Sequence, residues 1–369
     1  MAERTRTLMV STSYPADDED WKGRFIADMA TSLARQSDLT FSLWAPPGER
    51  PDGARDVSTT SDKAWLQGLM SRGGIASQLR NGGFKGLAQA AGLLKRLHAV
   101  YHREPQDIVH VNWLQNTLPL WGTRMPALVT VLGSDYGLLN KPGMRLLLRA
   151  VFRQRRTILA PNANWMVPRL ELEFGDVARI VPVPFGVDSR WFSVDRNHAE
   201  SGIWLAVTRI TRNKIGDLFN WGEGLFGPTR QLHLFGPMQE SLEPPPWVIW
   251  HGPTHPAALR DVWFPRANGL ITLSRHDEGR PQVMLEAMAA GLPVIASDLP
   301  AHRDFIEHEE TGWLAKSQGE FAAGLSVLED LSTSQQIGKH AQRWIKSTIG
   351  DWDDCAGRYI QLYKQLLAD

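Results

Sequence analysis

The chain has 369 residues, of which 43% are hydrophobic and 22% charged, and its formal net charge is zero. This composition excludes an intrinsically disordered chain, and at roughly 150 residues per domain the length predicts two domains or three. The single cysteine, Cys355, excludes an internal disulfide and favours a reducing compartment. The first residues lack the apolar core of a signal peptide. No apolar run reaches the ~18 residues of a membrane span, so we expect a cytoplasmic protein.

The charge is unevenly spread along the chain. Between Lys63 and Arg169 there are 15 Lys or Arg residues against three acids, Glu104, Asp107 and Asp135, a net of +12. Such a region is either an ordinary solvated face or a surface for an anionic partner such as a membrane, a lipid phosphate or a nucleic acid. The stretch "QLRNGGFKGLAQAAGLLKRLHAVYHR" mixes basic and apolar residues, as helices on membrane surfaces do. Both interpretations stay open.

Short β-rich runs alternate with helical patterns from the first residues onward. Most of these runs are almost continuously apolar, which is typical of strands buried on both faces of a parallel sheet. The alternation of strand and helix predicts an α/β fold with doubly wound sheets. In the first half the predicted strands are residues 7–13, 39–46, 107–114, 127–135, 157–162 and 179–186.

The second half repeats this alternation after a polar break near "PFGVDSRWFSVDRNHAESGIW". We therefore expect two Rossmann-like domains, residues 1–190 and 191–350, facing a cleft at the carboxyl ends of their strands, where ligands of such sheets bind. Residues 351–369 have helical apolar spacing, and this helix would pack back on the first domain. In the second half the predicted strands are residues 203–210, 231–237, 247–253, 269–275, 293–298 and 312–316.

The stretch "HDEGRPQVMLEAMAAGLPVIASD", residues 276–298, follows a buried strand and carries Glu278 and Glu286. Pro281 suits the first position of a helix, and Gly291 suits its left-handed end. The backbone N–H groups of Gly279, Arg280 and Pro281's neighbours would then favour an anion at the helix start. Each carboxylate can accept hydrogen bonds from hydroxyls, and an anion with many hydroxyls describes a nucleotide sugar. The alternative is a capping acid followed by a surface acid, but an unpaired carboxylate in a buried helix is costly.

The same stretch resembles the Glu-x7-Glu signature of glycosyltransferase family 4, which comprises retaining enzymes of the GT-B fold. The motif is long and specific, and the resemblance extends over most of the chain, more faintly in its first half. It implies that Glu278 contacts the transferred sugar and is catalytic, and that Glu286 binds the ribose hydroxyls of the donor. Gly279, Arg280 and Pro281 would complete the donor site.

A second element, "LAVTRITRNKIGDL", places Arg209 five residues before Lys214. The family has Arg and Lys at this spacing, and the resemblance implies that they bind the donor diphosphate. Two cations there would stabilise the charge that grows on the leaving phosphate without a metal ion. The chain departs from the family in having Thr208 where a glycine often stands. Further along, "LHLFGP" resembles the family's next strand and loop, where Gly236 would allow the donor to approach the backbone.

In the first half, "SYPADDEDWKGRFIADM" resembles the family's first loop and helix, which implies that Gly23 and Arg24 lie on the acceptor side. "VTVLGSDYGLL" resembles an acceptor-side strand that often carries a histidine, but Leu132 occupies that place here. We take Asp135 as the catalytic substitute. His110 is interpreted as a satisfied histidine within a strand.

The sequence thus predicts a metal-independent GT-B glycosyltransferase that needs no cofactor. Acidic runs at residues 17–20 and 351–354 suit a loop and a helix start better than a metal site. A hexose would move from a nucleotide-diphosphate sugar to a hydroxyl of a saccharide or lipid-linked acceptor. The resemblance implies retention of configuration, and the basic first domain favours work at an anionic membrane surface on lipopolysaccharide or polysaccharide precursors. We expect no nucleic-acid partner.

Two rivals to this interpretation remain open. The first is another activity on the same fold, a nucleotide-sugar epimerase or a phosphorylase. An epimerase would convert the donor without an acceptor, whereas a phosphorylase would require inorganic phosphate. The second is a non-catalytic protein that binds a sugar nucleotide or an anionic membrane, which the departure at Leu132 motivates. The sequence does not define the sugar, the base, the acceptor or the oligomeric state.

Overall fold

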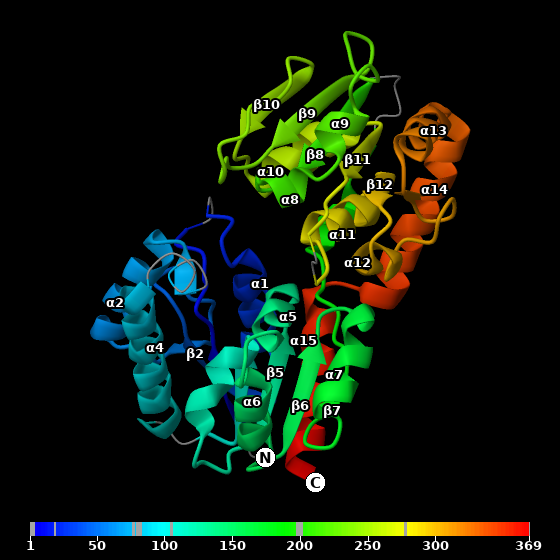
Figure 1. The fold of residues 1–369 in the computed structure, drawn as a ribbon. Helices are drawn as coiled ribbons and strands as arrows, with labels where there is room; N and C mark the ends of the chain where they lie inside the picture. Colours follow the sequence, from blue (N-terminus) through cyan, green and yellow to red (C-terminus); the bar gives the residue numbers. More distant parts are fainter. Residues whose placement is uncertain are drawn as a thin grey trace. The chain divides into compact units, whose positions relative to one another are not determined.

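The structure is a computed structural model that describes residues 4–17, 20–75, 78, 83–103, 106–196, 202–276 and 279–368. The chain forms two compact units (Figure 1). Unit 1 comprises residues 1–184 and 352–369, and unit 2 comprises residues 185–351. The first break therefore falls at 184/185, where the sequence had suggested 190/191. The reason is that the segment after residue 184 packs on unit 2, with Trp191 in its core 4.9 Å from the ring of Phe264.

Unit 1 is built on a parallel sheet of seven strands in the order β3-β2-β1-β4-β5-β6-β7. Each predicted strand of the first half forms at least in part, and the short polar strand β3 is an addition. Two predictions were too long, because 127–135 ends at Val131 before α5 and 179–186 is reduced to Arg179–Ile180. Their apolar runs are buried on both faces, as expected for strands covered by helices on each side. The strands are β1 (Thr5–Val10), β2 (Leu39–Trp44), β3 (Arg55–Asp56), β4 (Ile108–Asn112), β5 (Ala127–Val131), β6 (Thr157–Pro161) and β7 (Arg179–Ile180).

Helices cover both faces of this sheet. A large core joins alternate strand residues to the helices α2, α4, α6 and α7, while α1 and α15 pack against each other. The helical segments are α1 (Arg24–Ala34), α2 (Thr60–Ser71), α4 (Gly83–Arg103), η1 (Leu114–Leu120), α5 (Gly133–Leu139), α6 (Met144–Phe152), η2 (Asn164–Met166), α7 (Val167–Phe174) and α15 (Trp352–Ala368).

The last helix, α15, is bound to unit 1 by buried polar contacts. His110 of β4 lies 2.6 Å from the hydroxyl of Tyr363 and 2.7 Å from that of Thr130. The Thr130 hydroxyl in turn lies 3.2 Å from that of Tyr359. His110 is fully buried, and burial lowers its pKa from 6.5 to about 3, so it is neutral at physiological pH. This confirms its interpretation as a satisfied strand histidine.

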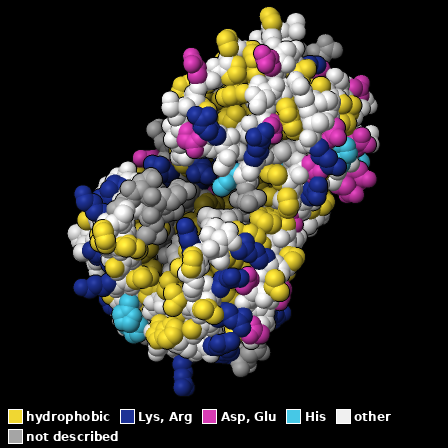
Figure 2. Space-filling model, in the orientation of Figure 1, with side chains coloured by type: hydrophobic (Ala, Val, Ile, Leu, Met, Phe, Trp, Pro, Cys, Tyr) yellow, Lys and Arg dark blue, Asp and Glu magenta, His cyan; other side chains and the backbone are white. Residues whose placement is uncertain are grey.

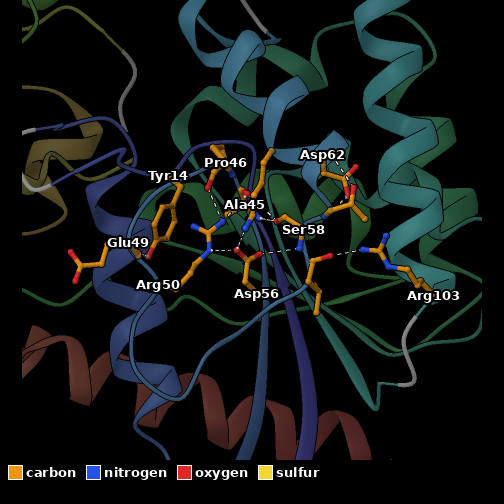
Figure 3. A network of polar contacts seen from close by, with 12 residues as sticks. Tyr14, Ala45, Pro46, Glu49, Arg50, Asp56, Ser58, Asp62 and Arg103 are labelled. Carbon is orange, nitrogen blue, oxygen red and sulfur yellow. Dashed lines mark hydrogen bonds and ion pairs between the residues drawn. The ribbon is translucent and has the colours of Figure 1, made fainter.

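A second polar network fixes the β3 edge of the sheet (Figure 3). Arg50 donates to the carbonyl of Pro46 at 2.8 Å and pairs with Asp56 at 3.1 Å. Asp56 accepts from the backbone of Ser58 at 2.9 Å, and the Ser58 hydroxyl donates to the Ala45 carbonyl at 3.0 Å. These contacts tie the short strand β3 to the end of β2, which explains how so polar a strand joins the sheet.

Unit 2 is built on a second parallel sheet, with six strands in the order β10-β9-β8-β11-β12-β13. All of the predicted strands of the second half are present in it. Together with unit 1, it confirms the predicted α/β class with two doubly wound sheets. The strands are β8 (Ile203–Val207), β9 (Gln231–Phe235), β10 (Val248–Gly252), β11 (Gly269–Thr272), β12 (Val294–Ser297) and β13 (Trp313–Ala315).

The helices of unit 2 bury one core on each face of this sheet. No helix in the described part of the chain, in either unit, is long and apolar enough to cross a membrane. The helical segments are η3 (Ser189–Ser193), α8 (Arg212–Ile215), α9 (Leu218–Trp221), α10 (Pro256–Ala258), η4 (Leu259–Trp263), η5 (Phe264–Arg266), α11 (Gln282–Ala289), α12 (Pro300–Arg303), α13 (Gln318–Glu329), α14 (Leu331–Trp344) and η6 (Ile345–Ile349).

Candidate functional site

The predicted donor residues gather at one edge of unit 2. Strands β9, β8 and β11 are neighbours and parallel, so the segments that follow them leave the sheet at the same carboxyl edge. Arg209 follows β8, Gly236 follows β9, and the segment 273–281 follows β11. In doubly wound sheets this edge is where ligands bind. The sheet therefore brings together groups that are up to 77 positions apart, from Arg209 to Glu286.

The basic pair lies on the turn between β8 and α8. The side chain of Arg209 is exposed and that of Lys214 is half-buried. Between them, Ile210 is fully buried and anchors the turn. Thr211 caps α8 by accepting from the backbone N–H of Lys214 at 3.2 Å. The turn thus holds two cations at the strand edge with a defined backbone.

This basic turn is locked to the segment after β11. Gly216 has a φ of +55°, and a Cβ on it would lie 1.9 Å from the carbonyl oxygen of Leu273. The backbone N–H of Arg275 donates to the carbonyl of Asn213 at 2.8 Å, and the Arg275 guanidinium pairs with Asp217. The segment 273–281, which leads through Glu278 to α11, is called the acidic loop below. Its start, residues 273–275, therefore packs as one piece with the turn that carries Lys214.

The acidic loop is braced by serine hydroxyls. The backbone N–H of His276 donates to the hydroxyl of Ser274 at 3.0 Å, and the hydroxyl of Ser297 donates to the carbonyl of Ser274 at 2.6 Å. The predicted catalytic Glu278 comes two residues after His276 and lies outside the described residues. Its role stays a prediction.

The helix after the loop starts one residue later than predicted. Pro281 has an extended ψ of 115° and is the N-cap of α11, because its carbonyl already accepts from Met284 at 3.2 Å while its own backbone stays outside the helix. Gly291, with a φ of +68°, follows the helix end as expected. Glu286 is half-buried between the fully buried Leu285 and Ala287, so it is not an ordinary surface acid.

Arg280 has a role that sequence reasoning missed. Its side chain is buried, pairs with the buried carboxylate of Asp304 and lies 5.7 Å from the ring centre of Phe305. The pairing partner is 24 positions away, and no spacing in the sequence signals it. The predicted contribution of Gly279 and Arg280 to donor binding was through backbone N–H groups, and it stays a prediction. The side chain of Arg280 instead anchors the loop.

Gly236 is required by the packing of the site itself. It has a φ of +134°, and a Cβ there would lie 1.8 Å from the carbonyl oxygen of Thr208, directly before Arg209. Its carbonyl accepts from the Trp250 indole at 3.2 Å. The glycine therefore lets the loop after β9 touch the basic turn, whether or not a donor also approaches it.

In unit 1, the predicted acceptor-side residues lie in the loop after β1. Gly23 has a φ of +70° and precedes α1, and a Cβ on it would lie 2.7 Å from both the Ser13 hydroxyl oxygen and the Tyr14 nitrogen. Arg24 is half-buried at the start of the helix. The structure explains why glycine is needed at position 23. The acceptor role of both residues stays a prediction.

Asp135 has contacts that the sequence did not suggest. It is 1% exposed, and its two carboxylate oxygens accept from the backbone N–H groups of Leu114 at 3.1 Å and Leu132 at 2.7 Å. Burial raises its pKa to about 7, against the opposing effect of these hydrogen bonds. The contacts make Asp135 the capping acid of α5. They do not support the predicted catalytic role, which no contact of the described residues favours.

Among the described residues, no cluster of three or more His, Cys, Asp or Glu side chains is arranged to hold a metal ion. The half-buried Lys214 and the exposed Arg209 are the cations that the sequence assigned to a diphosphate. The arrangement places positive charge at the strand edge, where it would attract an anion. It also places one carboxylate, Glu286, in a half-buried position on the adjoining helix.

Comparison with known proteins agrees with this geometry. Residues 240–348, which include the loop and α11, match the family model described as glycosyl transferases group 1. This match covers less than a third of the chain and supports its assignment as a family 4-like GT-B glycosyltransferase. The matched region lies wholly within unit 2, the unit that carries the basic turn and the acidic loop.

Solved structures show the same fold over nearly the whole chain. Sucrose-phosphate synthase from Thermosynechococcus elongatus has a TM-score of 0.73 at 19% identity and covers 99% of this chain and 100% of its own. HepE from Anabaena, in complex with UDP and glucose, has a TM-score of 0.68 at 13% identity, covering 98% and 100%. In sequence, the amylovoran biosynthesis glycosyltransferase AmsK of Erwinia amylovora is 41% identical over 58 residues, which is 16% of this chain and 14% of that protein.

Proposed function

We propose that this GT-B glycosyltransferase moves a hexose from a nucleotide-diphosphate sugar to a hydroxyl of a saccharide or lipid-linked acceptor, with retention of configuration and without a metal ion. Such a reaction would serve the synthesis of bacterial cell-surface polysaccharide, lipopolysaccharide or glycolipid. The observation that carries the proposal is the packing of the basic turn on the loop after β11, through Gly216 and Leu273. This packing joins the turn that carries Arg209 and Lys214 to residues 273–275, the start of the segment that leads to Glu278.

The mechanism follows from the charge that develops during transfer. As the glycosidic bond breaks, negative charge grows on the leaving diphosphate, and Arg209 and Lys214 would stabilise it. Glu286 would hold the ribose hydroxyls and Glu278 would orient the hexose. With retention and no enzyme nucleophile evident in the sequence, attack would occur on the face that the phosphate leaves, and that phosphate would help to deprotonate the acceptor hydroxyl.

The comparisons add support for a nucleotide-sugar donor. HepE from Anabaena has been solved with UDP-glucose, and a lipopolysaccharide outer core galactosyltransferase, WaaB, has a TM-score of 0.59 at 15% identity, covering 97% of this chain and 99% of its own. At these identities the likeness concerns the fold, so the donor and the pathway of this chain remain to be measured.

A thermal-shift panel of UDP-, GDP- and ADP-sugars in EDTA tests the donor site directly. A ligand at about 100 times its dissociation constant should stabilise the wild type by roughly 2.7 kcal/mol. Lys214→Ala should lose most of the shift because it removes one cation from the diphosphate. Lys339→Ala is the matched control, since Lys339 is an exposed lysine on α14 of the same unit, and it should keep the shift.

Three outcomes would speak against the proposal. If no nucleotide sugar shifts the wild type, with or without added magnesium, the assignment of this edge to donor binding fails. If both lysine variants behave alike, the basic turn is not the phosphate site. Conversion of a bound donor without any acceptor would instead identify an epimerase.

A further inference from the structure

Helix α4 of unit 1 lies in a long stretch without acidic residues. From Lys63 to Arg103 the sequence has seven Lys or Arg residues and no Asp or Glu. Most helices on protein surfaces carry both positive and negative side chains, so a helix with positive side chains alone needs an explanation. The explanation depends on which face of α4 is buried and which is exposed.

The inner face of α4 is fixed by specific contacts. Gly92 allows the helix to approach Trp65 of α2, where a Cβ would lie 3.4 Å from the ring. Arg96 lies 5.3 Å from the centre of the same ring and pairs with Asp62 at 2.9 Å. At the end of the helix Arg103 donates to the backbone carbonyl of Val57 at 2.5 Å (Figure 3). These contacts leave the helix no freedom to turn its outer face inward.

The outer face of α4 carries large apolar side chains in the open. Phe84 is 92% exposed and Leu87 is 61% exposed, and residues three apart lie on one side of a helix. Ala91 continues this side, and the exposed Lys85 and Lys95 lie beside and after the apolar residues. In Figure 2 hydrophobic, basic and histidine side chains follow one another over this helix.

We propose that this outer face of α4, formed by Phe84, Lys85, Leu87, Ala91 and Lys95, docks on an anionic lipid bilayer. Phe84 and Leu87 would enter the boundary of the acyl chains, and the lysines would meet the headgroups. Charge complementarity supports this partner because α4 itself (Gly83–Arg103) contains no acid to repel an anionic surface, while its Lys85 and Lys95 are exposed. Open apolar side chains beside the cations favour a bilayer over an acidic protein. No residue of unit 2 enters the proposal, so it stands apart from sugar transfer.

Co-sedimentation of the full chain with vesicles tests the proposal. Wild type should bind vesicles that contain phosphatidylglycerol about tenfold or more better than vesicles of phosphatidylcholine alone, and added salt should weaken this binding. Phe84→Ser/Leu87→Ser should lower the partition about tenfold by removing the apolar contact. Lys85→Glu/Lys95→Glu should lower it by a similar factor or more on the anionic vesicles alone.

A second pair of exposed leucines supplies the matched control. Leu146 and Leu147 of α6 are 73% and 50% exposed, but Arg145 on the same helix is paired with Glu173 at 2.8 Å. Leu146→Ser/Leu147→Ser should therefore bind vesicles like the wild type. Thermal unfolding of all variants should match the wild type, because the substituted side chains are exposed.

Several results would overturn the proposal. Sedimentation of the wild type with neither kind of vesicle, or equally with both, would do so. Normal binding by the serine pair on α4, or an equal loss of binding by the pair on α6, would do so as well. Retention on polyglutamate without vesicle binding would assign the face to an acidic protein instead.

Discussion

The two units use the same parallel architecture, but the predicted catalytic side chains at their strand ends differ in exposure. In unit 2 the segments after β8 and β11 leave Arg209 exposed and Lys214 and Glu286 half-buried. In unit 1 the predicted catalytic residue after β5, Asp135, turns inward and caps a helix at 1% exposure. The lesson is that a polar residue after a buried strand does not by itself mark a ligand site. Whether such a residue can bind a ligand depends on its exposure and on its hydrogen-bond and ion-pair partners.

The largest expected effect concerns the buried ion pair between Arg280 and Asp304, which anchors the loop before α11 in unit 2. Asp304→Leu leaves the buried Arg280 guanidinium without its carboxylate, which should cost about 3–5 kcal/mol of unfolding free energy. The double variant Arg280→Leu/Asp304→Leu should recover much of this loss, because no buried charge is then left unpaired. Denaturant unfolding followed by tryptophan fluorescence measures both variants. Equal destabilisation of the single and double variants would show that the pair itself is not the anchor.

The pH dependence of unit 1 should come from two inward-turned groups with opposite signs. Burial lowers the pKa of His110 to about 3, so its contribution to the unfolding free energy is complete above pH 6.5 and is lost as pH falls toward 3. Burial raises the pKa of Asp135 from 3.8 to about 7, so its contribution to the unfolding free energy is complete below pH 3.8 and is lost as pH rises through 7. Between pH 4 and 6.5 the two trends oppose each other.

Single variants should separate these two trends. Asp135→Asn should leave a stability that rises with pH by up to about 1.4 kcal/mol per unit between pH 4 and 6.5. His110→Gln should leave one that falls with pH over the same range. Only the slopes of unfolding free energy against pH are compared, since both variants also change hydrogen bonds. Variants with identical slopes would mean that the two groups do not titrate with shifted pKa values.

The sheets were predictable from the sequence because strands buried on both faces give continuous apolar runs. The short strand β3 was not, since Arg55 and Asp56 carry no apolar signal and join the sheet through the contacts of Arg50. The helix end at Gly291 was predictable from its need for a positive φ. The break between the units was misplaced because the polar stretch after residue 184 hides Trp191, which belongs to the core of unit 2.

The candidate site was predictable in outline only. The positions of Arg209, Lys214 and Glu286 at one strand edge follow from the parallel order of β8 and β11. Which polar residues turn inward does not follow from spacing. The partner of Arg280 is distant in sequence, and Asp135 lies in a stretch, "GSD", that was predicted as the end of a strand but forms the first turn of α5. Burial and partner choice are properties of the folded chain, and a local pattern carries no information on them.

A glycine comparison tests whether the basic turn and the acidic loop act as one piece. Gly216→Ala would place a Cβ against the carbonyl oxygen of Leu273, whereas Gly224→Ala, at a similar positive φ of 75°, meets nothing within 4 Å. Both variants bear the cost of a positive φ, and at Gly216, whose ψ is −117°, the backbone lies outside the left-handed helical region and favours glycine more strongly. Only Gly216→Ala should also weaken binding of a nucleotide sugar, by about tenfold or ~1.4 kcal/mol. Isothermal titration measures this, and equal affinities in the two variants would uncouple the turn from the loop.

The smallest effect concerns the helix that returns to unit 1. Tyr363→Phe removes the hydroxyl 2.6 Å from His110, and a buried nitrogen left without this partner should cost about 1–2 kcal/mol of unfolding free energy. Tyr359→Phe is the matched control, because its hydroxyl lies 3.2 Å from a Thr130 hydroxyl that keeps its contact with His110. Tyr359→Phe should therefore cost less unfolding free energy than Tyr363→Phe. Nucleotide-sugar binding should be unchanged in both variants, since the donor residues all lie in unit 2. A loss of donor affinity in Tyr363→Phe would contradict this division, because inward-turned polar groups of unit 1 would then serve the ligand site as well as the fold.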